Sequence, residues 1–358
     1  MRRITLGFAH FDDYSGAYFT AQHARLQELP ADCELELVFI DSSPETEHGR
    51  GLRKLASDIE SVCPVVYEAF EGSAGTSAPR ERVIERAAGE VVVVVDCHTY
   101  FAPGGLRSLI EEGRLLNPGC GDIVSGPLLY DDQRHHSTHF APVWRSDMFG
   151  IWADAWLPPS GDRTDPGRTC YSVHEGPDGR AEFLDLTAGI NADPFVGFPE
   201  IPYAGHQAAL RDAGWELQGE AGPDGDAAPF ETPGQGLGTF AIRKAQWPGF
   251  PPGLRGFGGE ELMLHERVRR TGGRAICVPA ARWGHRFVRP GGAPYPLRTW
   301  DRIRNYVLWA QALGLDVEFI RTYFVKEARR IDESQWEALL RDPLGMVDPG
   351  PASPAPGH

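Results

Sequence analysis

The stretch Val91–His98, VVVVVDCH, decides the fold of this chain. Its five consecutive valines are apolar on both faces of a strand, and their β-branched side chains favour an extended backbone. A run that is apolar on both faces is typical of a strand inside a parallel sheet that is covered by helices. Asp96 is the first polar residue of the stretch, so it marks the end of the strand.

On both sides of this strand, apolar runs of strand length alternate with segments of helical pattern. Strands are predicted at 3–10, 33–43, 64–70 and 122–128, and helices at 15–29, 77–90 and 104–113, the first of them opened by Ser15. Strands separated by helices imply right-handed crossovers. The predicted fold class is therefore α/β, with a mixed, mainly parallel sheet flanked by helices.

Parallel sheets of this kind bind ligands beyond the carboxyl ends of their strands. The residues at those ends are His10 to Asp13, Asp41 to Ser43, and Asp96 to His98. They are the first candidates for a functional site.

The pattern changes over residues 130–233, which are rich in Gly, Pro, Asp, His and Trp and show weak periodicity. We interpret them as a loop-rich central insertion that faces a substrate and is not an independent domain. Regular patterns return as a strand at 236–247, a helix at 260–273 and a strand at 274–280. Two or three amphipathic helices follow at 299–342, and residues 346–358 are predicted to form a disordered tail.

Composition excludes several classes of protein. The net charge of −15 disfavours a protein whose main affinity is for nucleic-acid phosphates. No run approaches the roughly 18 apolar residues of a membrane span, and the N-terminus does not read as a secretory signal. The six cysteines lack a CxxC pair, which indicates reduced thiols and a cytoplasmic protein.

Asp96 and His98 offer the clearest chemistry. Residues i and i+2 of an extended chain point to the same side, so a carboxylate and an imidazole can converge on one cation. This donor set suits Mn²⁺ or a related divalent ion better than Ca²⁺. His285, in the segment RWGHRF, is a candidate third ligand from a distant part of the chain. The alternative is a strand-end Asp with two unrelated histidines.

A third candidate is the segment GFGGEELMLHE, which contains Glu260 and Glu261. Its glycines allow the backbone to approach a ligand closely. The two carboxylates stand at a helix start, where negative charge is favoured in any case. Their functional interpretation is a base or an anchor for an acceptor hydroxyl.

Together these segments resemble known glycosyltransferases. The valine strand followed by DCH resembles the DxH metal motif of the polypeptide N-acetylgalactosaminyltransferases. The segments ETPGQGLGTFAIRKAQW and GFGGEELMLHERVRRTGGRAICVPAARWGHRF resemble the acceptor-side block of that family. Residues 3–126 are similar more broadly to family 2 glycosyltransferases, and the resemblance as a whole covers about 3–126 and 232–290.

The resemblance implies a GT-A fold that binds a UDP-sugar through a divalent metal, with Mn²⁺ expected and Mg²⁺ as the alternative. It implies metal ligation by Asp96, His98 and His285. It also implies contact between Asp41 and the nucleobase, and a place for Arg80 near the donor. Glu260 matches a family glutamate and Glu261 its neighbour, so the resemblance leaves open which of the two acts in catalysis.

The predicted elements and the resemblance also indicate how the chain is organised into domains. One domain is expected over 1–345, with a nucleotide-sugar half at 1–126, an acceptor half at 127–295 and C-terminal helices at 296–345.

Positive charge for the donor diphosphate is expected from Arg286, Arg289, Arg302 and Arg304. Candidates for stacking on a substrate are Trp144, Phe149, Trp152 and Trp156. A second metal site, or part of an acceptor pocket, is conceivable in the polar run Asp131, Asp132, His135, His136 and His139.

The predicted function is therefore a metal-dependent hexosyl- or N-acetylhexosaminyltransferase that acts on an acceptor hydroxyl. One alternative is a nucleotidyltransferase, although FAHFDDYSG lacks the Gly-rich loop expected after the first strand. The other is a non-catalytic protein that binds nucleotide sugars. The acceptor stays open between a glycan, a small molecule, a protein and a modified nucleic-acid base.

Overall fold

A computed structural model describes residues 1–71, 75–159, 170–186, 201–219, 227–287 and 297–345. Its largest sheet has eight strands in the order β14-β16-β6-β15-β4-β1-β2-β3. One half of this sheet is parallel and consists of β1 (Arg2–His10), β2 (Cys33–Asp41), β3 (Val65–Ala69) and β4 (Val91–Asp96).

The other half of the large sheet is mixed. Strand β15 (Thr239–Arg243) runs antiparallel to both β4 and β6 (Ile123–Ser125). Strand β16 (Ala275–Cys277) is parallel to β6, and β14 (Phe230–Glu231) closes the edge in the antiparallel sense. The predicted mixed, mainly parallel sheet is thus confirmed.

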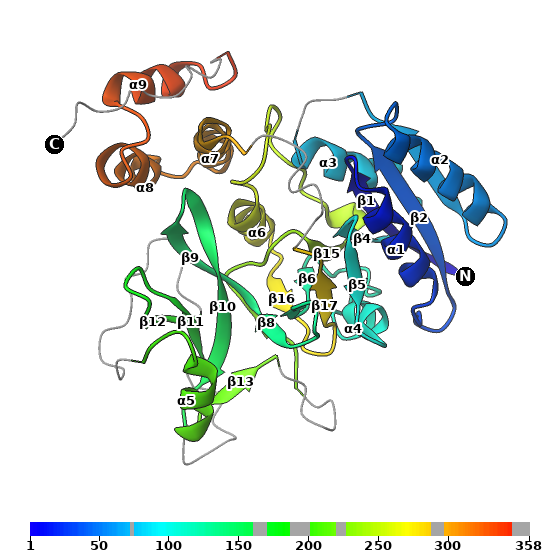
Figure 1. Cartoon of the computed structure of the whole chain (residues 1–358), viewed down its shortest axis with the longest axis horizontal. Coiled ribbons are helices and arrows are strands. Elements are labelled where there is room, and N and C mark those ends of the chain that lie inside the picture. The colour runs from blue at the N-terminus through cyan, green and yellow to red at the C-terminus, as the bar shows by residue number, and fades with distance from the viewer. Residues whose placement is uncertain (72–74, 160–169, 187–200, 220–226, 288–296, 346–358) are drawn as a thin grey trace.

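The valine strand β4 is buried on both faces, as its composition predicts. Val91, Val93 and Val95 pack into a core with α1 (Tyr14–Arg25), α2 (Glu47–Glu60) and α4 (Gly105–Glu111). Val92 and Val94 face the opposite core, which includes α3 (Ser77–Arg86) and α6 (Glu261–Arg270). Figure 1 shows the sheet between these two sets of helices.

Two helical details differ from the sequence prediction. Helix α1 is capped by Asp13, whose side chain accepts a hydrogen bond from Gly16 N, and not by Ser15. Helix α2 falls in a segment for which no helix was predicted. It nevertheless buries Leu52, Leu55 and Ile59 at helical spacing against the sheet.

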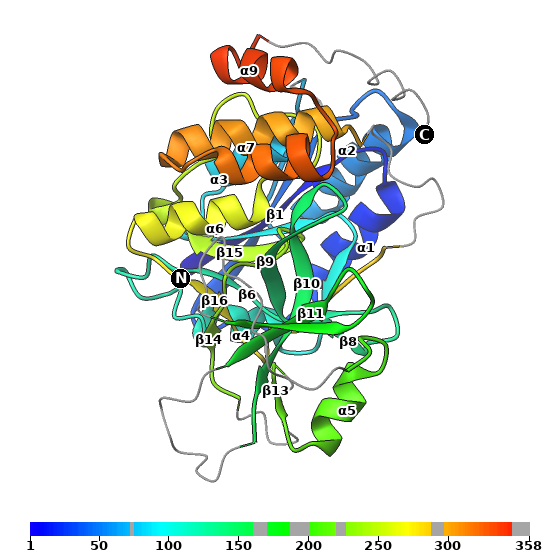
Figure 2. The same ribbon diagram turned by 90° about the vertical axis from the view of Figure 1, so that its left-hand side faces the viewer.

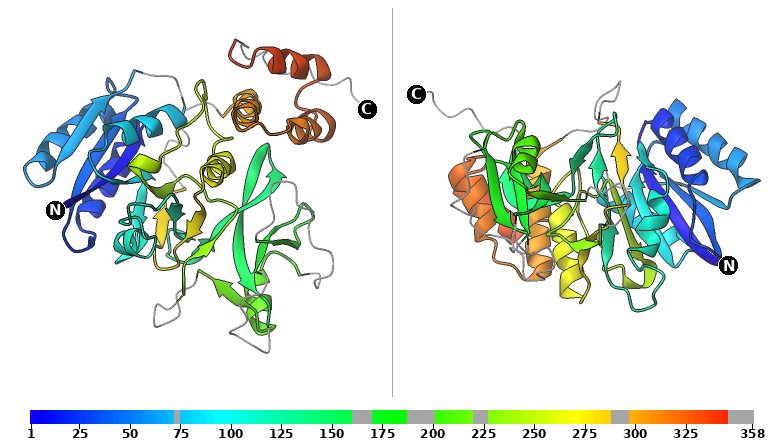
Figure 3. Two further views of the ribbon diagram at one scale, coloured as in Figure 1. Left: turned by 180° about the vertical axis from the view of Figure 1, so that it is seen from behind. Right: turned by 90° about the horizontal axis from the view of Figure 1, so that it is seen from below.

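The described parts of the central insertion contain more regular structure than their composition predicts. They form a second sheet in the order β12-β11-β10-β13, with β9 paired to β10. Its elements are β9 (His139–Arg145), β10 (Met148–Leu157), β11 (Tyr171–Glu175), β12 (Ala181–Asp185), β13 (Glu216–Gln218) and α5 (His206–Asp212). A small core that includes Trp156, Phe183 and Trp215 lies against this sheet. Figure 3 shows the insertion at the opposite end of the molecule from β1–β3.

A third, small sheet brings distant segments together. It has the order β5-β17-β7-β8 and contains β5 (Thr99–Phe101), β17 (Trp283–His285), β7 (Leu128–Leu129) and β8 (His135–Ser137). Strand β5 follows β4 after only two residues, and its antiparallel partner β17 places His285 opposite Thr99. This register positions the candidate site.

The C-terminal segment is helical, as predicted. It consists of α7 (Thr299–Leu313), α8 (Glu318–Arg321), a π-helical turn (Thr322–Glu327) and α9 (Glu333–Arg341). Helix α7 packs on α6, and Figure 2 shows α7 and α9 above it. The continuous core from β4 to α9 favours a single domain, whose end at 345 stays a prediction. The predicted tail 346–358 lies outside the described residues.

Two further sequence predictions can be compared with the structure. All six cysteines fall within the described residues and are free thiols. Among the helices of the described ranges, none has both the length and the apolar character that crossing a bilayer requires.

Candidate active site

The three predicted metal ligands meet at the end of β4. Strand β4 ends at Asp96, a two-residue turn carries His98, and the pairing of β5 with β17 brings His285 across. One ligand atom from each of the three side chains lies within 4.8 Å of those of the other two. The structure therefore brings together three residues that are separated by up to 189 positions in the sequence.

The geometry of these three side chains fits a cation. The Nε2 atoms of His98 and His285 lie 2.9 Å apart, and His285 Nε2 lies 3.3 Å from Asp96 Oδ2. Two imidazole lone pairs at this separation repel each other unless a proton or a cation lies between them. Two imidazole nitrogens and a carboxylate oxygen suit Mn²⁺ and related divalent ions. That these residues bind a metal stays a prediction.

Asp96 is held by a buried arginine. Arg80 donates to Asp96 Oδ1 at 2.8 Å and to Glu260 Oε1 at 3.3 Å, and Thr76 donates its hydroxyl to the same Glu260 oxygen at 2.5 Å. Burial alone would raise the pKa of Asp96, but the Arg80 charge and the His285 hydrogen bond outweigh it and hold that pKa well below its usual range. Asp96 is therefore an anion at neutral pH. Arg80 lies near the predicted donor site and contacts the metal-ligand candidate directly.

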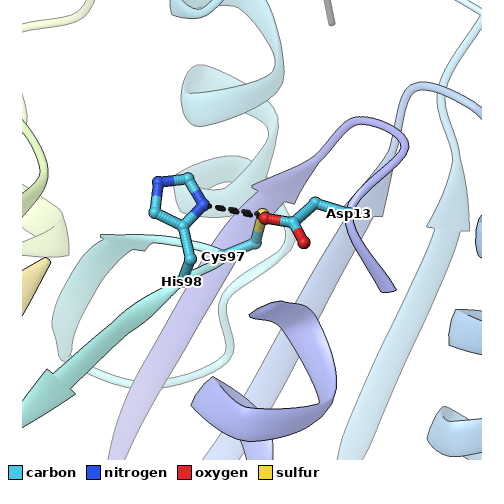
Figure 4. Close-up of side chains that lie close together, drawn as sticks. All are labelled: Asp13, Cys97 and His98. Atoms are coloured by element: carbon cyan, nitrogen blue, oxygen red, sulfur yellow. Dashed lines mark hydrogen bonds and ion pairs between the residues drawn. The ribbon is translucent and has the colours of Figure 1, made fainter. Parts of the chain in front are cut away.

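His98 has a second carboxylate neighbour. Its Nδ1 lies 3.2 Å from Asp13 Oδ2, and Arg286 donates to both oxygens of Asp13 at 2.7 and 2.8 Å. Figure 4 shows the Asp13 carboxylate facing the His98 ring, with Cys97 beside it. The sequence placed Asp13 at a strand end without a role. Only the folded chain shows that it lies against His98.

A cavity of about 640 Å³ opens in front of this cluster. Asp96, His98 and His285 line it together with residues from both halves of the chain. On the parallel-sheet side the lining includes His10, Phe11, Ser42, Thr76 and Pro79. On the opposite side it includes Phe140, Arg145, Met148 and Trp152 from the insertion, and Glu261 from α6. His98 also lines a second cavity of about 630 Å³, together with Tyr100 and Arg286.

Asp41 does not line either cavity. Its side chain is fully buried and accepts hydrogen bonds from the Tyr67 hydroxyl at 2.8 Å and from Ser43 N at 2.9 Å. His10 Nδ1 lies 2.9 Å from the same carboxylate. Contact between Asp41 and a nucleobase stays a prediction, and this enclosed position does not favour it. The neighbouring Ser42 is the residue that faces the cavity.

The structure separates the two adjacent glutamates, which the sequence could not do. Glu260 is fully buried and binds Arg80, whereas Glu261 lines the cavity. Burial and the neighbouring charge of Glu260 raise the pKa of Glu261 to about 8. Glu261 is thus the glutamate that a substrate can reach.

The arginines and aromatic residues that were predicted to contact a substrate do not all lie at the cavity. Arg286 is engaged by Asp13 and Ser15, Arg302 donates to Phe257 O, and Arg304 is buried against the backbone of Gly253 and Pro343. Arg289 lies outside the described residues. Of the four candidate stacking residues, only Trp152 lines the cavity. The others are packed in hydrophobic clusters: Trp144, Phe149 and Trp156.

The polar run in the insertion does not form a second metal site. His135 pairs with Asp154 at 2.7 Å, and His139 pairs with Ser172 at 2.8 Å. Asp131 is exposed and Asp132 pairs with Arg134. In the described part of the chain, groups with the spacing of metal ligands occur only around His98.

Comparisons with known proteins agree with this architecture. No protein-family model matches the chain. A 78-residue segment is 36% identical to polypeptide N-acetylgalactosaminyltransferase 11 of Xenopus tropicalis, which is 20% of this chain and 13% of that protein. The solved structure of GalNAc-T7 with UDP, GalNAc and Mn²⁺ superposes with a TM-score of 0.52 and 16% identity, over 96% of this chain and 57% of that one. This chain therefore spans little more than half of GalNAc-T7.

The mannosyltransferase PcManGT from Pyrobaculum calidifontis, in complex with GDP-Man and Mn²⁺, superposes with a TM-score of 0.47 and 15% identity, over 98% of this chain and 77% of that one. At these identities the structural likeness establishes the fold alone. The chain has the GT-A fold of glycosyltransferases. The resemblance inferred from the sequence is therefore confirmed for the fold.

Proposed function

We propose that the protein is a metal-dependent glycosyltransferase that moves a sugar from a UDP-sugar to an acceptor hydroxyl. The observation that carries the proposal is the convergence of Asp96, His98 and His285 in a cavity of about 640 Å³. This cavity lies at the carboxyl ends of the parallel strands, where such sheets bind nucleotides. The sugar is a hexose or an N-acetylhexosamine. The identity of the acceptor stays open, and the cytoplasmic location stays a prediction from the sequence.

The proposed donor lies along the parallel-sheet side of the cavity. There Ser42, Thr76 and Pro79 provide the wall for the nucleoside, and the metal-ligand candidates lie where a diphosphate would follow. Bound to Asp96, His98 and His285, Mn²⁺ or Mg²⁺ would supply a Lewis acid for the diphosphate leaving group. Arg80 contributes by keeping Asp96 ionised and fixed in position.

Glu261 is the proposed acceptor-side residue. Breaking the anomeric C–O bond builds positive charge on the sugar, and the attacking hydroxyl loses its proton. A cavity-facing carboxylate can orient that hydroxyl and accept the proton. Glu260 acts at a distance, because its contacts to Arg80 and Thr76 hold the arginine against Asp96.

The raised pKa of Glu261 predicts a pH profile. A base must be deprotonated, so kcat/KM should increase with pH up to about 8 and then level off. Replacing Glu261 with Gln should lower kcat roughly 100-fold and remove this dependence. The measurement is kcat/KM between pH 6 and 9 at saturating metal.

The exposed Glu337→Gln variant in α9 serves as a control, because it changes the same chemical group on a distant helix. It should retain the wild-type rate and profile. A Glu261→Gln enzyme with the wild-type rate and the same rise toward pH 8 would contradict the role of Glu261.

The identity of the donor can be tested by thermal unfolding with UDP-, GDP-, TDP- and CMP-sugars, with and without Mn²⁺. A ligand at 100 times its Kd stabilises the folded state by about 2.7 kcal/mol, so the true donor should give the largest rise in Tm. We expect the largest rise in Tm with a UDP-sugar, and only when Mn²⁺ is present. A rise that is equal for all four nucleotides, or independent of Mn²⁺, would argue against the proposal. Release of UDP and not of pyrophosphate distinguishes sugar transfer from nucleotidyl transfer.

A further inference from the structure

We propose that Asp13 is a positioning residue of this centre: it binds the Nδ1–H of His98, so that the Nε2 lone pair faces the cation, and Arg286 locks it in place. The inference rests on the proposed metal-dependent function. It assigns a role to a residue that lines the cavity and is not one of the three proposed metal ligands.

The contact between Asp13 and His98 decides the tautomer of the histidine. Asp13 ends the turn after β1, and its side chain is only 12% exposed. An ionised carboxylate only accepts hydrogen bonds, so the His98 Nδ1 that faces it at 3.2 Å must carry the proton. The Arg286 guanidinium donates to both oxygens of Asp13, a geometry that favours the ionised carboxylate. With Nδ1 donating to Asp13, Nε2 is the His98 ring nitrogen that faces Asp96 and His285.

Arg286 makes the arrangement rigid. Its guanidinium donates to both Asp13 oxygens, at 2.7 and 2.8 Å, and to Ser15 Oγ at 3.2 Å. Arg286 directly follows His285, so this ion pair ties the end of β17 to the turn between β1 and α1. The same contact therefore fixes both histidines relative to each other. Carboxylates that hydrogen-bond to ligating histidines commonly set ring orientation and ligand basicity at metal sites.

A second cation between Asp13, Cys97 and His98 is the competing interpretation of this cluster. These three side chains also have the spacing of metal ligands, and Cys97 Sγ lies 3.6 Å from His98 Nδ1. However, the guanidinium of Arg286 already binds both oxygens of Asp13. A divalent ion there would lie close to a like charge, which is unfavourable. The hydrogen-bonded arrangement is therefore the one that the geometry supports.

The test variants must preserve the helix cap, because Asp13 also accepts from Gly16 N at 3.1 Å. Serine caps helices about as well as aspartate but is one bond too short to reach both Gly16 and His98. Asp13→Ser thus removes the contact to His98 and keeps a capping residue. Asp13→Asn is a second variant that preserves size and capping and removes only the charge.

The neighbouring Asp12→Asn variant is the matched control. The carboxylate of Asp12 is 44% exposed and lies 3.6 Å from His48 Nδ1. Its backbone has a φ of 51°, a left-handed conformation that asparagine tolerates well. This variant removes a charge from the same turn without affecting the contact to His98.

The first measurement is the Kd for Mn²⁺, obtained from the electron paramagnetic resonance signal of free Mn²⁺ during titration of the metal-free protein. We expect a Kd about 10- to 100-fold higher for Asp13→Ser, a smaller increase for Asp13→Asn, and a change below about twofold for Asp12→Asn. The second measurement is a long-range nitrogen–proton correlation spectrum of the histidine rings without metal, with the His98 signals assigned by their loss in His98→Gln. It should show His98 protonated at Nδ1 in the wild type and predominantly at Nε2 in Asp13→Ser.

The outcomes separate this inference from the proposed function. If the wild type binds Mn²⁺ and both Asp13 variants bind it with the same Kd, the role of Asp13 is wrong and the metal centre stands. If the His98 tautomer is unchanged in Asp13→Ser, the inference is also wrong. If the wild type does not bind Mn²⁺ and no UDP-sugar stabilises it, the proposed function fails and the inference fails with it.

Discussion

Replacing His285 with alanine is expected to reduce sugar transfer at least about 1,000-fold while the protein remains folded. His285 supplies one of only three side chains of the proposed metal site and lies at the end of a three-residue strand. Losing it removes the Lewis acid from the leaving group, which is worth several kcal/mol of transition-state stabilisation. His98→Ala should have the same effect. The measurement is the rate of UDP release with saturating Mn²⁺ and donor.

His48→Ala is the control for this experiment, because His48 is a half-exposed histidine of α2 that does not line the cavity. It should leave transfer within about twofold of the wild type, since surface substitutions usually change little. Full turnover by His285→Ala in the presence of Mn²⁺ would show that the three residues do not form the metal site.

Replacing Arg80 with methionine is expected to destabilise the protein by about 3–5 kcal/mol, because it leaves the partly buried Asp96 and the buried Glu260 without their shared cation. For a chain of this size, Tm should fall by roughly 4–7 °C at pH 7. Arg80 depresses the pKa of Asp96, and this stabilisation is present above about pH 4 and is lost as the pH falls further. The difference in Tm between variant and wild type should therefore narrow below pH 4.

Arg107→Ala provides the comparison for Arg80→Met. Arg107 forms an exposed ion pair with Glu111 at 2.9 Å on the surface of α4. Pairs of this kind contribute at most about 1 kcal/mol, so Tm should change by no more than about 3 °C. If Arg80→Met unfolds at the same temperature as Arg107→Ala, the buried pairs around Arg80 do not stabilise the fold.

The parallel half of the fold could be predicted because its signal is local. Five valines in a row specify a strand that is buried on both faces, and the polar residues that end it fall at the ligand-binding edge of the sheet. The pairing of β5 with β17 could not be predicted from the residues alone. Each strand has three residues, and their register depends on contacts between segments more than 180 positions apart. The sequence offers His285 only as a candidate ligand, and the resemblance implies its place beside Asp96 and His98.

The roles of Asp13, Glu260 and Glu261 depend on which side chains are buried together. Sequence patterns do not distinguish a glutamate that binds a buried arginine from its neighbour that lines a cavity. Asp13 has two local signals, a strand end and a helix cap, and neither indicates His98. These assignments follow from long-range geometry.

The sequence predicts less regular structure in the central insertion than the fold contains, because the strand signals there are irregular. Strand β10 contains Gly150 at a φ of 126°, and its pairing with β9 shifts register between Phe149 and Ile151. Such a bulge interrupts the alternation of polar and apolar residues by which a strand is recognised. Later in the same strand, Trp156 packs in a local core, whereas Trp152 lines the cavity.

The most direct test of the proposed centre is anomalous diffraction at the manganese edge from crystals grown with UDP and Mn²⁺. We expect one strong peak within bonding distance of Asp96 Oδ2 and of the Nε2 atoms of His98 and His285, in contact with the diphosphate. A peak between Asp13 and Cys97, or no peak at the end of β4 although UDP is bound, would contradict the proposed centre.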